Sequence, residues 1–309
     1  MTAARRALAV LAVAIALIAR SGFACPCGDS ASGGGPLTGS VDRFAVLAGQ
    51  SLSLAHGAWN ADGRYTRLDT DQGTLLVMAA GAYRPFDDLE ASLELTLQET
   101  WLRFERFETE DSGFGDTRAR LWWDAVDEPM PYERLPWPAV SAYLWLRAPT
   151  GVVDATSGKG GSLGASGAGQ GLGTWEAALG ARLQKGFMPH FRVAASGEAA
   201  LRLPDDELGF ERKLGPRALA QLSGQYLPSA DVDLGLVTSL AWEGEVAVEG
   251  RRRDGTAQRL WTVGATTSYT PPRTALRLSL LVDVAPPVDS VSANALGSVR
   301  IGWSLAYVD

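Results

Sequence analysis

The sequence predicts an all-β protein: an antiparallel transmembrane β-barrel of about twelve strands after a cleaved signal peptide. Apolar and polar residues alternate along almost the whole body of the chain, in segments of roughly ten residues. Only a β-strand places residues i, i+2 and i+4 on one face. Strands of soluble sandwiches usually have about 5–6 residues, whereas about 9–11 are needed to cross a bilayer. Segment length therefore favours a membrane barrel, and an even strand count suits antiparallel closure.

The composition agrees with this fold and excludes several other classes. The chain has 309 residues, a formal net charge of −7 and 46% hydrophobic residues. An acidic balance argues against a nucleic-acid partner, which would need a basic stripe. The 2 cysteines exclude a disulfide scaffold and a four-cysteine zinc site, and the 2 histidines argue against a multi-histidine metal centre. We expect no metal, no cofactor and no nucleic-acid partner.

The N-terminal residues have the order of a secretory signal peptide. Arg5 and Arg6 precede an apolar run over residues 7–19, and small residues lead to a cleavage point after Ala24. The run is too short to span a bilayer, for which about 20 residues are needed. The predicted segments are a signal peptide at 1–24, a flexible stub at 25–49 and an outer-membrane β-barrel at 50–309.

Cys25-Pro26-Cys27 has three functional interpretations: lipidation of Cys25, metal binding, and redox chemistry. Phe23 and Gly22 are unfavourable residues before a lipidated cysteine, and the spacing is not the Cys-x-x-Cys of redox sites. A stretch rich in Ser and Gly follows and is typical of a linker. The favoured interpretation is a disordered, dispensable segment over Cys25–Pro36.

The strands follow from the alternation, segment by segment. In Thr174–Lys185, for example, Leu179 and Leu183 alternate with Glu176 and Arg182. The predicted strands lie near 50–59, 74–84, 89–103, 113–124, 139–148, 174–185, 190–203, 214–226, 231–243, 257–270, 274–284 and 295–308.

Short and long connections alternate, as expected for periplasmic turns and external loops. The short turns are 84–88, 186–189, 228–231 and 271–273, while 125–138 is longer than this rule expects. The long loops are 60–73, 104–112, 149–173, 204–213, 244–256 and 285–294. Aromatic residues near the strand ends predict girdles at the two membrane interfaces. These are Trp59, Tyr83, Trp101, Trp123, Trp175, Tyr226, Trp242, Trp261, Tyr269 and Tyr307.

The two faces of the strands separate apolar from charged residues. The face expected to contact lipid includes Leu89, Leu93, Leu179, Val193, Leu278, Ile301 and Trp303. The other face predicts the functional site, a charged lumen. Its residues are Glu90, Glu94, Arg118, Arg120, Arg147, Glu176, Arg182, Arg192, Glu198, Arg202, Arg217, Asp233, Glu243, Arg277, Asp283 and Arg300. These charges form a polar conduit for solutes, or they pair across neighbouring strands and plug the lumen.

Three motifs resemble one known family. They are Gly113-Phe-Gly-Asp116, Leu146-Arg-Ala-Pro-Thr-Gly151 and Gly171-Leu-Gly-Thr-Trp175, and they follow one another in the middle third of the chain. Their order and spacing are similar to the transporter-like outer-membrane β-barrels grouped with the phenol meta-degradation pathway (MetA-type) porins. The resemblance implies uptake or efflux of small, often hydrophobic molecules. Outer-membrane barrels typically end on an aromatic residue. This chain differs, because Val308 and Asp309 follow Tyr307.

The function expected is passive conduction of small solutes, hydrophobic or aromatic ones among them, across the outer membrane of a Gram-negative bacterium. Expected partners are outer-membrane lipid, the solute, the barrel-assembly machinery and periplasmic chaperones. The alternative is a structural or ligand-binding barrel without transport. An outer-membrane hydrolase is disfavoured, because His56 lies in the first strand and His190 at a turn of the opposite end. The glycine-rich loop 158–173 is no phosphate loop, since Lys159 is followed by Gly160.

Overall fold

The structure, a computed structural model, is all-β over its described residues. These are residue 37 and residues 42–69, 71–104, 107–126, 137–151, 173–188, 190–207, 210–229, 231–272 and 274–309. None of them belongs to a helix long and apolar enough to cross a membrane. The expected signal peptide, the Cys25-Pro26-Cys27 motif and most of the glycine-rich loop lie outside the described residues.

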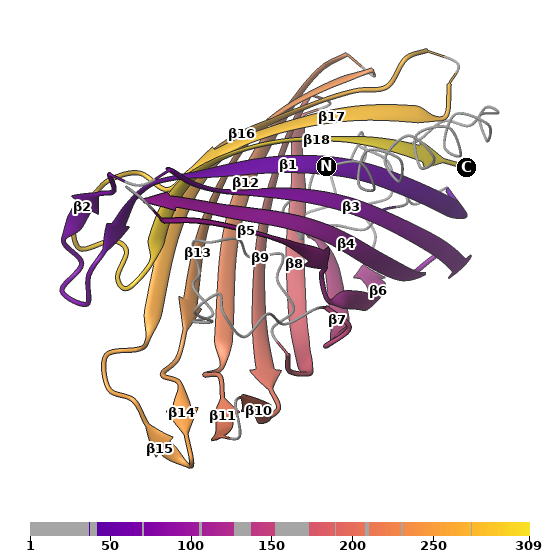
Figure 1. The fold of residues 1–309 in the computed structure, drawn as a ribbon. Helices are drawn as coiled ribbons and strands as arrows, with labels where there is room; N and C mark the ends of the chain where they lie inside the picture. The colour runs from indigo at the N-terminus through magenta and orange to yellow at the C-terminus, as the bar shows by residue number, and fades with distance from the viewer. Residues whose placement is uncertain are drawn as a thin grey trace.

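Eighteen strands are present in the described residues, most of them long and strongly curved (Figure 1). They are β1 (Phe44–Trp59), β2 (Tyr65–Arg67), β3 (Asp71–Phe86), β4 (Leu89–Phe104), β5 (Phe107–Phe114), β6 (Thr117–Val126), β7 (Ala139–Ala148), β8 (Glu176–Met188), β9 (Phe191–Arg202), β10 (Asp205–Glu207), β11 (Phe210–Lys213), β12 (Arg217–Ser229), β13 (Val232–Glu243), β14 (Ala247–Val248), β15 (Arg251–Arg252), β16 (Gln258–Tyr269), β17 (Leu276–Val284) and β18 (Leu296–Val308).

One antiparallel sheet closes on itself into a barrel. It contains 14 strands in the order β18-β17-β16-β13-β12-β9-β8-β7-β6-β4-β3-β1-β2, with β5 beside β4. Pairing of β1 with β18, from Ala45 opposite Val308 to Ala58 opposite Leu296, completes the ring. The short β2 is a side branch, and β5 and β6 both pair with β4 as two parts of one strand. The wall therefore has twelve strands, which confirms the predicted fold class.

Several strand boundaries differ from the sequence expectation. The expected loop 60–73 contains β2 and the first residues of β3. Two further differences have a clear cause. The segment 104–112 was expected as a loop, but β5 begins at Phe107 and pairs with β4. Its Glu108-Thr-Glu-Asp-Ser112 run is polar on both faces, so the alternation that marks a strand is missing there. Strand β1 begins at Phe44 instead of residue 50, because the closing pairing with β18 extends to Ala45.

A second sheet stands outside the barrel wall. Its four strands follow the order β10-β11-β14-β15, and Figure 1 shows them projecting beyond the ends of the long strands. Segments 204–213 and 244–256 were expected as loops. They form strands because they pair with each other, as Arg212 does with Val248.

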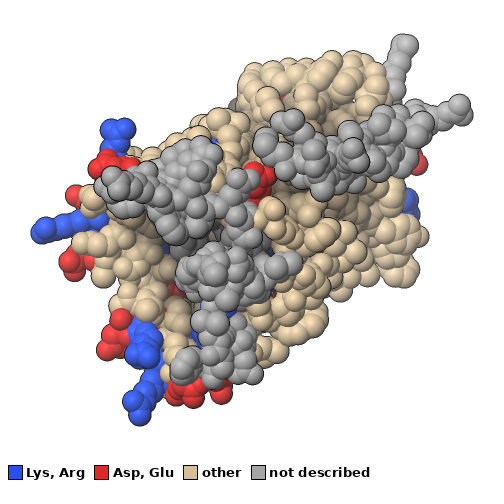
Figure 2. All heavy atoms as spheres, in the orientation of Figure 1, with Lys and Arg blue, Asp and Glu red and all other residues tan. Residues whose placement is uncertain are grey.

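Side chains alternate between an exposed outer face and a buried inner face. In β8, Leu179 is 65% exposed, while its neighbours on the inner face, Ala178 and Arg182, are 2% and 4% exposed. The residues expected to contact lipid lie on the outer face: Leu93, Leu278, Ile301 and Trp303 are exposed, and Leu89 and Val193 are partly exposed. Figure 2 shows uncharged atoms over the barrel body and charged ones gathered at the end that carries β2 and the second sheet.

Most of the expected aromatic positions agree with girdles at the strand ends. Tyr83, Trp123, Trp175, Tyr226, Trp242 and Tyr269 are exposed on the outer face. The prediction for Trp59 is wrong, because its side chain is only 3% exposed and packs against Ala285 and Ala295. Its ring Nε1 donates a hydrogen bond to the Val288 carbonyl, so it fixes an end loop and does not face lipid.

Candidate functional site

The predicted lumen residues all occupy the face that alternates with the exposed leucines. Glu90, Arg147, Glu176, Arg182, Arg202, Asp233, Glu243, Arg277 and Asp283 are buried. Glu94, Arg118, Arg120, Arg192, Glu198, Arg217 and Arg300 are partly exposed. The alternation therefore brings them onto one inner surface, and their role in solute passage stays a prediction.

A row of charges crosses five consecutive strands of this inner surface. Strand register places Glu94, Arg118, Arg147, Glu176 and Arg202 opposite one another in turn. Ion pairs join Arg147 Nη1 to Glu176 Oε2 at 3.1 Å, and Arg202 Nε to Glu176 Oε1 at 3.2 Å. Because Glu176 is 0% exposed, its charge depends on nearby arginines such as these two.

The row continues beyond β9. Arg202 also pairs with Glu243 on β13, so one guanidinium holds two buried carboxylates. On the opposite side of the barrel, Arg300 pairs with Asp283 across β17 and β18. Buried charges must be paired to be tolerated, so much of the predicted lumen charge braces the wall from inside.

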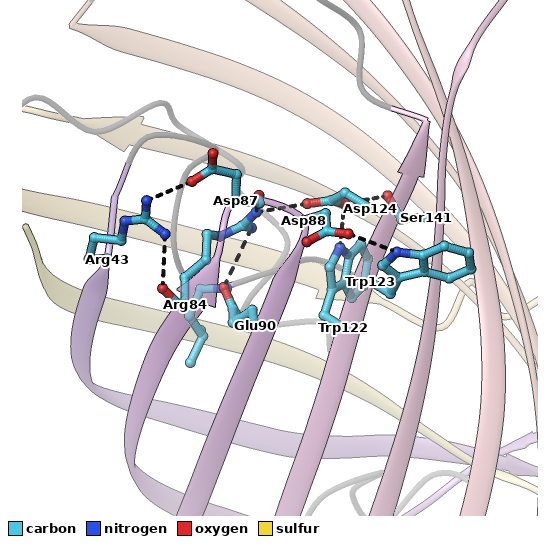
Figure 3. A network of polar contacts seen from close by, with 10 residues as sticks. Arg43, Arg84, Asp87, Asp88, Glu90, Trp122, Trp123, Asp124 and Ser141 are labelled. Atoms are coloured by element: carbon cyan, nitrogen blue, oxygen red, sulfur yellow. Dashed lines mark hydrogen bonds and ion pairs between the residues drawn. The ribbon is translucent and has the colours of Figure 1, made fainter.

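A polar network at the turn end of β3, β4, β6 and β7 was not predicted (Figure 3). Arg84 is 1% exposed, and its Nη1 donates to Asp124 Oδ2 at 3.0 Å and to the Asp87 carbonyl at 2.6 Å. Trp122 Nε1 donates to the other Asp124 oxygen at 2.7 Å. Arg84 belonged to an expected turn, so the alternation did not mark it. Asp124 shares the phase of Arg118 and Arg120, which is the signal that could have found it.

Aromatic residues fill the inner side of β6 and β7. The rings of Trp122 and Tyr143 stack with centroids 5.1 Å apart and an interplanar angle of 1°. The Arg118 and Arg147 guanidinium carbons lie 5.0 and 5.4 Å from the Trp145 ring centroid. Trp122, Tyr143 and Trp145 are at most 3% exposed. They fill this sector of the lumen. The sequence analysis did not name them, but they share the inward strand phase of the predicted lumen residues, which is the signal that could have found them.

The rest of the inner wall carries smaller groups. Buried hydroxyl and amide residues there are Ser53, Thr74, Thr96, Gln98, Gln221, Ser223, Gln225, Ser268 and Ser304. Beside them, Leu47, Ala80, Ala82 and Ala306 form an apolar cluster against which Leu37 and Met78 pack. The Leu37 backbone N–H donates to Glu90 Oε1 at 3.0 Å. Residue 37 was expected in the flexible stub, but it contacts the inner wall of the barrel.

Two of the three sequence motifs meet in space. Asp116 Oδ1 accepts a hydrogen bond from the Gly151 backbone N–H at 3.1 Å. Thr150 Oγ1 accepts one from the Thr117 N–H at 2.8 Å. These contacts hold the point where β5 ends and β6 begins against the end of β7, so these motif residues stabilise a strand junction.

The two histidines of the chain lie at opposite ends of the barrel, and each contacts neighbouring groups. Within the described ranges, no three His, Cys, Asp or Glu side chains are grouped to hold a metal ion. His56 is hydrogen-bonded to Tyr65 Oη at 2.8 Å and to the Ala285 carbonyl at 3.0 Å. His190 contacts the Leu227 carbonyl at the other end of the barrel. Gly160–Gly164 has the Gly-x-Ser-x-Gly spacing of a nucleophile elbow, but it lies outside the described residues.

Comparison with known proteins identifies similar folds. No model of a protein family matches the chain, and no curated protein matches it. A solved structure, the COG4313 outer membrane channel from Pseudomonas putida F1, is similar with a TM-score of 0.69 and 17% identity, covering 87% of this chain and 96% of that one. The β domain of the Bordetella autotransporter BrkA is similar with a TM-score of 0.50 and 11% identity, covering 87% and 100%. These similarities show that the chain shares the β-barrel fold of these structures.

Proposed function

We propose that this chain is a passive outer-membrane channel for small solutes, which cross through its charged lumen. The observation that carries the proposal is the distribution of side chains, which is the reverse of that in a soluble protein. Leucines such as Leu236, 69% exposed, cover the outside, while arginines and carboxylates face the inside. A soluble protein would bury the leucines, whereas a membrane barrel exposes them to hydrocarbon. The similarity to the Pseudomonas putida channel supports the same function.

Residence in the outer membrane follows from this function. The outer face is then solvated by lipid, with Tyr83, Trp123 and Trp175 at the interfaces. Such a barrel reaches the membrane by export, so a signal peptide at 1–24, periplasmic chaperones and the barrel-assembly machinery belong to the proposal. A narrower form of the proposal is that the chain belongs with the MetA-type porins and passes hydrophobic or aromatic solutes. The three motifs and the apolar cluster around Leu47 support it.

Conductance in planar bilayers tests the proposal. Purified, refolded protein is expected to give discrete current steps in potassium chloride, and vesicles that contain it should admit small labelled solutes. The control is the same preparation after thermal unfolding, which should give neither. Folded barrel that inserts into vesicles and passes no ion or solute would contradict the channel.

A barrel that binds ligands without transport is the second candidate. Its support is that side chains fill part of the lumen. Trp122, Tyr143 and Trp145 are buried there, and nearby arginines are held in ion pairs with Glu176. Solute binding without flux would favour this candidate, and flux would exclude it.

A further inference from the structure

The second sheet, which projects from one end of the barrel, has two edges of opposite charge (Figure 1). Its strand order makes β10 one edge and β15 the other, and neither edge pairs with a further strand among the described residues. Strand β10 consists of Asp205-Asp206-Glu207. Strand β15 consists of Arg251 and Arg252, and Arg253 follows it. One edge therefore carries three acidic residues and the other three arginines.

The basic edge is open to solvent. All three side chains of Arg251–Arg253 are exposed. Glu249, in the turn before β15, is engaged elsewhere, because its Oε1 accepts the Glu211 backbone N–H of β11 at 2.7 Å. Asp254, the next residue along the chain, offsets only one of the three positive charges. The guanidinium groups of this edge are therefore available to an acidic partner outside the sheet.

The two edges of one copy are complementary to each other. Charged residues on an exposed edge normally keep sheets apart, because edges of like charge repel. Here two acidic edges repel and two basic edges repel, but an acidic edge attracts a basic one. Every pairing in the sheet is antiparallel, so its first and fourth strands run in opposite directions. The β10 edge of one copy, beside the β15 edge of a second copy in the same orientation, therefore continues the antiparallel alternation.

A membrane places these edges at the same height in neighbouring copies. The sheet begins just beyond the outer apolar surface: Leu203 is 59% exposed two residues before β10, and Trp242 is 44% exposed near the end of β13. Hydrocarbon holds that apolar surface at one depth in every copy. Copies inserted in the same direction then differ only by translation and by rotation about the membrane normal, so the acidic edge of one can face the basic edge of the next.

We propose that the partner of the second sheet is a second copy of this chain, with the acidic β10 edge of one barrel bound to the basic β15 edge of its neighbour. The interface is heterologous, because the two copies contribute different surfaces, so it produces rows or rings of barrels. The association rests on the membrane location given above and not on conduction, so it goes beyond the channel function.

Energy transfer between labelled copies in vesicles tests this association. Donor and acceptor dyes are attached to Val288→Cys, an exposed position, in a chain whose Cys25 and Cys27 are replaced by Ser. We expect transfer above that of random mixing at the same protein density. Transfer should fall to the random level at 1 M salt, where charges are screened beyond about 3 Å. Transfer that never exceeds random mixing would overturn the proposal.

Charge reversal tests each edge. Arg251→Glu with Arg252→Glu gives a copy with two acidic edges, and Asp205→Lys with Asp206→Lys gives a copy with two basic edges. Each variant alone should show transfer at the random level, because its like edges repel. An equal mixture of the two variants, with the donor on one and the acceptor on the other, should recover the transfer of the parent. A mixture that stays at the random level would contradict pairing between the edges.

The matched control is Arg64→Glu with Arg67→Glu, which reverses two exposed arginines in and beside β2 and changes the net charge by the same amount. It should leave the transfer unchanged, and a loss equal to that of the β15 variant would mean that net charge governs the association. Heat-modifiable migration on gels shows that each variant is folded. Barrels that conduct ions but do not associate refute the association alone, and barrels that associate but conduct nothing refute the channel alone.

Discussion

At the scale of single residues, Gly180 on β8 permits the aromatic stack inside the barrel. A Cβ at this position would lie 2.2 Å from Cζ of Tyr143, whose ring is stacked on Trp122. We expect Gly180→Ala to lower the free energy of unfolding by about 1–3 kcal/mol, because the ring must move out of a packed position. Urea unfolding in vesicles measures it.

The matched control for that prediction is Gly197→Ala on β9. A Cβ there meets nothing closer than the Leu219 carbonyl oxygen at 4.0 Å. Its unfolding free energy should stay within about 0.5 kcal/mol of the parent, as for other substitutions away from packed sites. Equal losses in the two variants would show that the Tyr143 contact is unimportant.

Arg202 is the residue whose loss should be most costly among the paired arginines. Arg202→Met leaves Glu176 and Glu243 buried without their shared partner, and we expect a loss of about 3–5 kcal/mol. Arg43→Met provides the comparison, because the Arg43–Asp87 pair is 56% and 86% exposed and should be worth about 0–1 kcal/mol. Similar unfolding midpoints for the two variants would contradict the buried network.

At the scale of whole strands, the depth of a lipid-facing residue should decide what a charge costs. Leu179 and Leu203 are 65% and 59% exposed, and Leu203 lies beside Trp175 at the end of its strand. We expect Leu179→Arg to cost about 2–4 kcal/mol and Leu203→Arg about 0–1 kcal/mol. Folding yields and unfolding free energies in vesicles measure both, and a larger cost at Leu203 would place the bilayer elsewhere on the barrel.

The junction between β5 and β6 gives a second prediction at this scale. Asp116 is 8% exposed and accepts the Gly151 N–H, which Asp116→Ala leaves without this acceptor. We expect Asp116→Ala to cost about 1–3 kcal/mol and Asp116→Asn less, because the amide oxygen remains an acceptor. Thermal unfolding of both variants measures the difference. If Asn is as destabilising as Ala, the hydrogen bond is not what holds the junction.

At the scale of the whole molecule, the lumen and the chain carry opposite charge balances. The sixteen residues predicted to line the lumen include nine arginines and seven acidic residues, although the chain has a net charge of −7. A lumen of this sign should favour anions. We expect Arg192→Ala, which removes a partly exposed arginine, to move the reversal potential under a salt gradient toward cations. A reversal potential that stays the same, together with lowered stability, would mean that Arg192 braces a closed lumen.

The sequence by itself determined the strand type, the strand rhythm and the face on which each residue lies. Alternation with period two is a property of one strand, so Leu179 could be placed outside and Glu176 inside without any knowledge of their neighbours. The sixteen lumen candidates share this phase, which is why all of them occupy the inner face. Strand β5 was not predicted, because its polar run does not alternate with apolar residues.

The tertiary structure alone decided which of these residues meet. The pairing of β1 with β18 joins residues from the two ends of the described barrel, and only that register fixes the ring. The same holds for Arg84 with Asp124, for Tyr143 over Gly180 and for Leu37 against Glu90. Register and closure depend on distances between segments far apart in the chain, and no local pattern encodes them.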